Sequence, residues 1–205
     1  MTKYTVCVDT TLHSSGLIQK QMKPAVKLRN SNEYIDRHYA IHLYRIFTDG
    51  SKKESLVGSG FYVNSNYIKR VFIKRLENHF SNNVAEMQAI SDSLLFVASD
   101  ESIRTDTVLI LTDSLPMCEY LKTNPIDDTK KKQDTLVFLK DRVYQLCVSL
   151  KERGIHVTIT WIPAHCAIEG NTVADWAADK GRLLDQIGEL QELPLPLMRD
   201  SKTSG

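Results

Sequence analysis

The stretch Trp161–Gly181, WIPAHCAIEGNTVADWAADKG, decides the fold because it joins the end of a strand to a loop and a helix. The alternating run Ile155–Trp161 (IHVTITW) is typical of a strand. The loop carries His165, and the helix offers Asp175 near its start. Asn171 is suited to cap this helix, and a glycine ends it. The stretch therefore predicts a histidine and an acid close to the end of the last strand.

The strands expected upstream of this stretch fall into two groups. Three runs follow one another at hairpin spacing, Ile41–Thr48, Leu56–Asn64 and Tyr67–Ile73, which predicts an antiparallel meander. Thr107–Leu111 (TVLIL) is almost wholly apolar, as in a strand that is buried on both faces and lies parallel to its neighbour. We therefore predict an α/β fold with a five-stranded mixed sheet, three antiparallel strands and then two parallel ones, flanked by helices.

Helices are expected between these strands. The first runs from Asn82 or Asn83, either of which is suited to cap it, to about Ala98. Its apolar residues recur every three or four positions and form one buried stripe. A short helix is expected at Leu115–Leu121 and a long one at Thr135–Arg153.

Four acids stand at the ends of these elements. Asp49 ends the first strand, Glu86 opens the first helix, Asp113 ends the fourth strand, and Asp175 lies in the last helix. Taken singly, each has a structural explanation, as a turn residue or as an acid favoured by a helix dipole. Parallel neighbouring strands, however, place Asp49 and Asp113 side by side.

Crowded carboxylates repel one another, so such a cluster is stable only around cations. Ligands that are all oxygen favour hard ions such as Mg²⁺ or Mn²⁺. Two ions about 4 Å apart suit the hydrolysis of a phosphodiester.

Composition narrows the class of protein. The formal net charge is +1, and Arg45–Arg182 carries 18 Lys/Arg and 18 Asp/Glu, so any nucleic-acid binding must come from local basic patches and bound metal. No apolar run approaches the roughly 18 residues of a membrane span, and the N-terminus lacks a signal pattern. An intracellular protein without membrane attachment is expected. Its four scattered cysteines are then free thiols.

The two ends of the chain are less patterned. Residues 1–40 are expected to be an extension or linker, with a basic arm that touches a substrate as the alternative. Weak alternation in Lys3–Asp9 is compatible with a strand. Residues 183–205 contain two prolines and are expected to form a partly disordered tail. The domain itself is expected to span residues 41–182.

The motifs together resemble the type 1 ribonuclease H domain, and most closely the RNase H domains of retroelement (reverse transcriptase) polyproteins. The matching pieces are IFTDGS (Ile46–Ser51), NNVAEMQAI (Asn82–Ile90), ILTDS (Ile110–Ser114) and WIPAH…GN…AD (Trp161–Asp175). The resemblance implies an RNase H-like fold. It also implies an endonuclease that cleaves the RNA strand of an RNA/DNA hybrid, leaves 5′-phosphate and 3′-hydroxyl ends, and is tethered to a reverse transcriptase.

The resemblance also implies roles for individual residues. The expected ligands of two Mg²⁺ ions, with Mn²⁺ as a substitute, are Asp49, Glu86, Asp113 and Asp175. His165 matches the family histidine that assists proton transfer or product release. The residues expected to contact nucleic acid are Gly50, Ser51, Ser81, Asn82, Asn83 and Ser114.

The chain departs from many cellular members at two places. Leu115 stands where they carry a groove-reading glutamine, and the basic, Trp-rich protrusion is reduced to Lys130–Lys132. A second candidate basic patch consists of Lys69, Arg70, Lys74 and Arg75. Two alternative functions stay open: a catalytically inactive RNase H-fold module that binds nucleic acid or protein, and a nuclease of the same fold that acts on another duplex.

Overall fold

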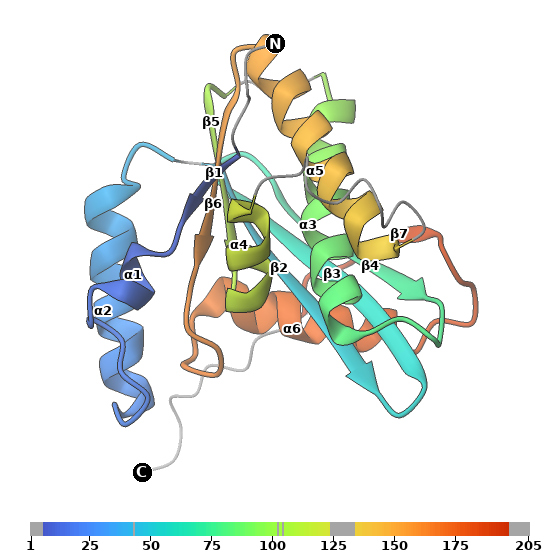
Figure 1. The fold of residues 1–205 in the computed structure, drawn as a ribbon, viewed down its shortest axis with the longest axis horizontal. Coiled ribbons are helices and arrows are strands. Elements are labelled where there is room, and N and C mark those ends of the chain that lie inside the picture. The colour runs from blue at the N-terminus through green and yellow to red at the C-terminus, as the bar shows by residue number, and fades with distance from the viewer. Residues whose placement is uncertain (1–5, 43, 102, 104, 124–133, 197–205) are drawn as a thin grey trace.

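A seven-stranded mixed sheet forms the centre of the computed structural model, which describes residues 6–42, 44–101, 103, 105–123 and 134–196 (Figure 1). The strand order is β1-β6-β5-β2-β3-β4-β7. The strands are β1 (Cys7–Asp9), β2 (Tyr44–Lys53), β3 (Leu56–Ser65), β4 (Lys69–Leu76), β5 (Thr107–Thr112), β6 (His156–Trp161) and β7 (Leu190–Leu193). The helices are α1 (Thr11–Ser14), α2 (Pro24–His38), α3 (Asn82–Ser99), α4 (Leu115–Lys122), α5 (Thr135–Glu152) and α6 (Glu169–Gly181).

The predicted α/β class and mixed sheet are confirmed. β2, β3 and β4 form an antiparallel meander, while β5 and β6 run parallel to β2. The parallel register pairs Thr48 with Thr112, and Thr112 with Trp161. The last residues of β5 and β6 therefore lie level with Thr48, in the middle of β2. The prediction that Asp49 ends the first strand is wrong, because β2 continues along β3 to Lys53. Asp49 and the residues that follow β5 and β6 are nevertheless gathered in one region of the sheet.

The predicted count of five strands is wrong, because the described part of the chain adds one short strand at each edge. β1 pairs in parallel with β6, where Cys7 lies opposite Thr158. β7 pairs antiparallel with β4, where Leu193 lies opposite Val71. These strands have three and four residues. β1 falls within the weakly alternating run Lys3–Asp9, whereas β7 lies in the residues that were expected to form a partly disordered tail.

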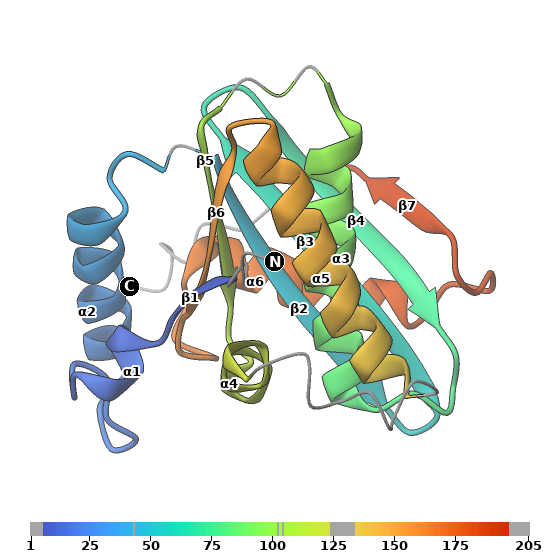
Figure 2. The same ribbon diagram turned by 45° about the horizontal axis from the view of Figure 1, so that its top comes forward.

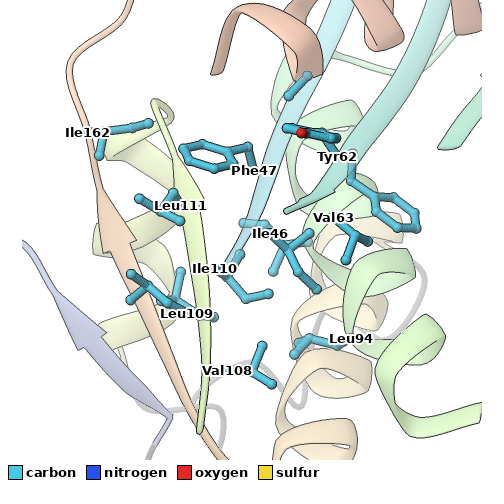
Figure 3. Packing of buried hydrophobic residues seen from close by; sticks show 14 of the residues in the cluster. Ile46, Phe47, Tyr62, Val63, Leu94, Val108, Leu109, Ile110, Leu111 and Ile162 are labelled. Carbon is cyan, nitrogen blue, oxygen red and sulfur yellow. The ribbon is translucent and has the colours of Figure 1, made fainter. Parts of the chain in front are cut away.

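Helices cover both faces of the sheet. α3 and α5 lie on one face and α6 on the other (Figures 1 and 2). Between these layers the side chains of Val108–Leu111 in β5 are 0% exposed, so this strand is buried on both faces as predicted. Figure 3 shows these residues with Ile46 of β2 and Leu94 of α3 in the same core.

Two glycines let α6 lie directly on β3. A Cβ atom added at Gly60 would stand 2.4 Å from the backbone nitrogen of Ala178, and one at Gly58 would stand 2.1 Å from that of Arg182. Both contacts are with backbone, so a side chain at either position would push the helix away. Because α6 also carries Asp175, this close packing fixes the position of that acid.

The caps of two helices differ from the prediction. Ser81, rather than Asn82 or Asn83, caps α3, because its hydroxyl accepts a hydrogen bond from the backbone nitrogen of Val84 at 3.2 Å. α6 begins at Glu169, two residues before the expected cap, and Asn171 lies within its first turn. The side chain of Asn171 points to the site described below, so it is not available to cap the helix.

The N-terminal segment packs against the sheet. Leu12 of α1 is 1% exposed. The carboxylate of Asp9 accepts hydrogen bonds from the backbone nitrogen of Thr11 at 2.8 Å, from the hydroxyl of Tyr34 at 2.7 Å, and from the hydroxyl of Tyr39. Burial raises the pKa of Asp9, but these hydrogen bonds outweigh it and lower the pKa to about 2. Asp9 thus joins β1 to α2.

Replacing Asp9 by alanine is expected to lower the free energy of unfolding by about 2 kcal/mol, because two tyrosine hydroxyls lose a charged acceptor. The depressed pKa means that this contribution is present above about pH 4 and is lost as the pH falls through about 2. Urea unfolding at pH 7 measures the loss. Asp36→Ala is the control, because Asp36 is 72% exposed and its ion pair with Arg45 is worth less than about 0.5 kcal/mol. Equal effects of the two changes would contradict the role of Asp9.

The structure describes only one of the two predicted basic patches. Lys130–Lys132 lies outside the described residues. In the other patch, Arg70 pairs with a glutamate of β7 at 2.6 Å, Lys74 pairs with a buried aspartate of α3 at 3.0 Å, and the guanidinium of Arg75 is buried against backbone carbonyls. Three of its four cations therefore bind groups of the protein itself.

Two further expectations concern the whole chain. The four cysteines are free thiols, two of them buried. Within the described ranges, no helix combines the length and apolar character needed to cross a bilayer.

Candidate active site

Three carboxylates from three separate elements converge where β5 ends beside the middle of β2. Asp49 comes from β2, Glu86 from the first half of α3, and Asp113 follows β5. Each offers an oxygen atom, and these oxygens all lie within 4.8 Å of one another. Asp49 and Glu86 are 6% and 5% exposed. The structure therefore brings together three of the four predicted acids in a largely buried cluster.

The approach of α3 to β2 depends on Gly50. A Cβ atom at this position would stand 2.4 Å from the backbone nitrogen of Glu86 and 2.7 Å from the carbonyl carbon of Ala85. Without a side chain at position 50, the first turns of α3 lie directly on the strand. The Asp-Gly pair therefore provides both an acid and the space for the helix that carries the second acid.

Burial and mutual repulsion disfavour the charged forms of all three acids. Burial, followed by the charges of Asp113 and Asp175, raises the pKa of Asp49 to about 9. Burial and the charge of Asp49 also raise the pKa of Glu86 well above its usual value. The pKa of Asp113 is raised by burial, although a hydrogen bond from Asn171 and the charge of His165 oppose the rise.

The cluster has the features of a cation site. Glu86 Oε2 is buried without a hydrogen-bond partner among the described residues. Over the same residues, no lysine or arginine forms an ion pair with Asp49, Glu86 or Asp113. Buried carboxylates are normally paired or bound to metal. An all-oxygen set of this kind fits hard divalent cations.

Asp175 and His165 lie on the exposed side of the cluster. Asp175 is exposed on α6 and raises the pKa of Asp49 through its charge and through a hydrogen bond between the two carboxyl groups. His165 is exposed in the loop before α6, with a φ angle of +52°, and its charge acts on Asp113. Both predicted residues are therefore beside the three-carboxylate cluster and accessible from solvent.

The residues expected to contact nucleic acid surround this cluster. Ser81, Asn82 and Asn83 are exposed at the start of α3, and the side chain of Asn82 donates to Glu86 Oε1 at 3.3 Å. The hydroxyl of Ser51 donates to a carboxylate of α6 at 2.5 Å. Ser114 is 8% exposed, so its side chain offers little surface.

Two residues near Asp113 were not predicted as part of the site. Asn171 Nδ2 donates to Asp113 Oδ2 at 3.0 Å, and Trp161 Nε1 donates to the backbone carbonyl of Asp113 at 3.1 Å. Both residues belong to the stretch that resembles the family, so their presence there was a signal. Their direction toward Asp113 was not evident from the sequence.

The metal-free protein is expected to lose stability as the pH rises from about 4 to about 9. Below about pH 4, Asp49 is protonated in both the folded and the unfolded state. Above it the unfolded chain ionises, while the folded protein holds its proton up to a pKa of about 9. Thermal unfolding in EDTA across this pH range measures the effect. Mg²⁺ should reduce the decline, and a Tm independent of pH in EDTA would contradict the raised pKa.

The mixed sheet and the carboxylates gathered beside the end of β5 define an RNase H-like α/β domain. The model of the RNase H family matches residues 42–182, and the chain belongs to this family. The predicted RNase H-like fold is thereby confirmed. A comparison with curated proteins gives no match.

Solved structures share the fold at low sequence identity. The foamy viral protease-reverse transcriptase in complex with RNA/DNA hybrid is 18% identical with a TM-score of 0.57, and the match covers 70% of this chain and 20% of the viral chain. LC9-RNase H1, a type 1 RNase H with the type 2 active-site motif, is 15% identical with a TM-score of 0.53, and the match covers 69% of this chain and 72% of that protein. The chain thus spans a fifth of the viral chain that it matches.

Proposed function

We propose that this protein is a ribonuclease H that hydrolyses the RNA strand of RNA/DNA hybrids. Residues 41–182 form the catalytic domain in this proposal, residues 1–40 an N-terminal extension, and residues 183–205 a C-terminal tail. Membership of the RNase H family supports the reaction class.

One observation carries the proposal: three carboxylates from three elements present oxygens within 4.8 Å of one another. Asp49, Glu86, Asp113 and Asp175 would hold two Mg²⁺ ions, with Mn²⁺ as a substitute. When bound, such ions lower the pKa of a water molecule and stabilise the leaving oxygen of a phosphodiester. The raised pKa values of the buried acids support cation binding, because a cation removes the repulsion that raises them.

The residues of the chain orient the reaction around this cluster. Asn171 donates to one oxygen of Asp113 and leaves the other free to act as a ligand. Asn82 likewise donates to Oε1 of Glu86 and leaves Oε2 without a hydrogen bond from the described residues. His165, exposed next to Asp113, is placed to take up or deliver a proton at the open side of the site. The leaving 3′-oxygen is protonated there, and the products carry 5′-phosphate and 3′-hydroxyl ends.

Recognition of the hybrid requires groups that detect the 2′-hydroxyls of one strand. The backbone of Gly50 and Ser51 and the exposed side chains of Asn82 and Asn83 are proposed for this contact. Ser81 caps α3 and also faces solvent, where it is proposed to bind a phosphate of the DNA strand. Ser114, which directly follows Asp113, is also proposed to contact the nucleic acid.

The parent protein is proposed to be the polyprotein of a retroelement, in which this domain is tethered to a reverse transcriptase and acts inside the cell. Leu115, in the place of a groove-reading glutamine, is the residue that supports this origin. Among the structures that share the fold, the foamy viral protease-reverse transcriptase was solved with an RNA/DNA hybrid.

The test is cleavage of a hybrid labelled at one end of its RNA strand, in Mg²⁺, Mn²⁺ or EDTA. Double-stranded RNA and double-stranded DNA of the same sequence run alongside. We expect endonucleolytic cuts in the RNA of the hybrid alone, which depend on metal and disappear in Asp113→Asn. Cutting of double-stranded RNA at the same rate would overturn the substrate assignment. Metal-independent binding without cleavage would instead fit an inactive RNase H-fold module.

A further inference from the structure

Residues 10–32 carry four cations and no acid: Lys20, Lys23, Lys27 and Arg29 are the only charged side chains between Asp9 and Glu33, apart from His13. The catalytic domain itself has no basic excess, since Arg45–Arg182 is balanced in charge. A domain with a cluster of acids at its centre repels phosphates unless cations lie nearby. Residues 55–76 carry as many cations and no acid, but three of those four bind groups of the protein itself, whereas residues 10–32 keep exposed lysines.

The segment lies at the active-site end of the protein. The ring of His13 packs edge-on against the ring of Trp161, with centroids 5.2 Å apart, and the indole of Trp161 donates to the backbone carbonyl of Asp113. Lys27 is close enough to Cys166 for its charge to act on that thiol, which follows His165 in the chain. Both views show the loop before α2 at the same end of the molecule as the loop between β6 and α6 (Figures 1 and 2).

The loop that carries Lys20 and Lys23 is held in place by α2, the helix that follows it. Asn30 Nδ2 donates to the carbonyl of Leu17 at 2.8 Å, and Lys27 Nζ donates to the carbonyl of Lys20 at 3.3 Å. Lys20 and Lys23 themselves are exposed, and neither forms an ion pair with any described residue. Their charges therefore face solvent from a fixed position.

We propose that the basic loop, defined as residues 19–27, contacts the sugar–phosphate backbone of the nucleic-acid duplex beyond the carboxylate cluster. The inference rests on the proposed function for the position of the duplex. The basic loop lies outside residues 42–182, so this contact is additional to the matched family domain. Phosphate contacts add affinity without reading sequence and lose it with added salt. The basic loop thus raises affinity for long duplexes without changing the chemistry.

The test compares Lys20→Gln/Lys23→Gln with a control that removes the same charge, Lys151→Gln/Arg153→Gln. Lys151 lies in the last turn of α5 and Arg153 is its C-cap, so both lie near the start of β6, at the opposite end of the strands from the carboxylates. The substrate is a hybrid of about 20 base pairs, which at roughly 3.4 Å per base pair is longer than the domain. Cleavage kinetics are measured, and binding is measured by fluorescence anisotropy in an Asp113→Asn background.

For Lys20→Gln/Lys23→Gln we expect KM and Kd to rise about threefold to tenfold and kcat to stay unchanged. The slope of log K against log salt should become shallower by about 1 to 2, because each phosphate contact contributes about 0.9. A hybrid too short to extend past the carboxylates should bind both variants equally. The control should match the wild type.

The possible failures are distinguishable. If Lys20→Gln/Lys23→Gln and the control have the same Kd and salt slope while the wild type cleaves hybrid, the basic loop proposal is wrong and the proposed function stands. A fall in kcat at unchanged KM also overturns the proposal. If the wild type cleaves no hybrid, the proposed function fails, and the anisotropy measurement still decides whether the basic loop binds a duplex.

Discussion

Replacing Asp49 by asparagine is expected to lower hybrid cleavage by about 10³-fold or more. Asp49 lies at the centre of the cluster, within 4.8 Å of oxygens from Glu86 and Asp113 and in contact with Asp175. Its loss would remove a charged ligand from the proposed cation site. Metal-bound sites supply several kcal/mol of charge stabilisation to the transition state, and each 1.36 kcal/mol is a factor of ten in rate.

The same substitution is expected to stabilise the metal-free protein. Asparagine keeps the shape of the side chain and removes an acid that has to keep its proton in the folded protein at pH 8, because burial and neighbouring acids raise its pKa to about 9. We expect a gain on the order of 2 kcal/mol at pH 8, which corresponds to a rise in Tm of about 5 °C for a domain of this size. Loss of activity together with a gain in stability is the signature of a functional acid rather than a structural one.

The measurements are hybrid cleavage in Mg²⁺ and thermal unfolding in EDTA with and without added Mg²⁺. Asp141→Asn on the exposed face of α5 is the matched control and should change neither property. The wild type should be stabilised by Mg²⁺, and Asp49→Asn should be stabilised much less. An Asp49→Asn protein that cleaves at the wild-type rate, or that unfolds at a lower temperature in EDTA, would contradict the cluster as a metal site.

Replacing Gly60 by alanine is expected to destabilise the protein by about 3 kcal/mol and to lower cleavage by about 10²-fold. Gly60 lies opposite Asp49 in the register of β2 and β3. The added Cβ would stand 2.4 Å from the backbone nitrogen of Ala178 and 2.6 Å from Ala177, so α6 has to move. That movement carries Asp175 away from the cluster.

Cleavage is measured well below the Tm of the variant, so that loss of folded protein does not account for the loss of rate. Gly154→Ala is the matched control. A Cβ there meets nothing within 4 Å, although its φ of +81° makes the substitution unfavourable by about 1 kcal/mol. The control should therefore lose some stability and keep its activity. Full activity in Gly60→Ala would show that the packing of α6 does not position Asp175.

Much of the fold and the cluster could be predicted from local patterns. The wholly apolar run in β5 indicated a strand buried on both faces, and its parallel partner placed Asp113 beside Asp49. Glu86 was expected near the start of a helix because apolar residues recur every three or four positions after Asn82. In each case the physical signal lies within a few residues, and one rule of sheet geometry brings the pieces together.

The remaining features depend on contacts that leave no local pattern. Only Ser31, Tyr34 and Ile35 are buried in α2, and most of its other residues are polar, so the sequence of this helix resembles that of a solvated segment. Ser81, Asn82 and Asn83 are all suited to cap a helix, and only the backbone angles select Ser81. An asparagine that faces a carboxylate, as Asn171 does, has the same sequence signature as a capping residue.

The two short edge strands have a practical consequence for shortened versions of the protein. Cutting the chain to residues 42–182 would remove β1 and β7 and leave one side of β6 and of β4 with open backbone donors and acceptors. Unprotected edges of this kind recruit strands from other molecules. A minimal version should therefore self-associate and precipitate, whereas the chain that keeps both flanks should remain monodisperse.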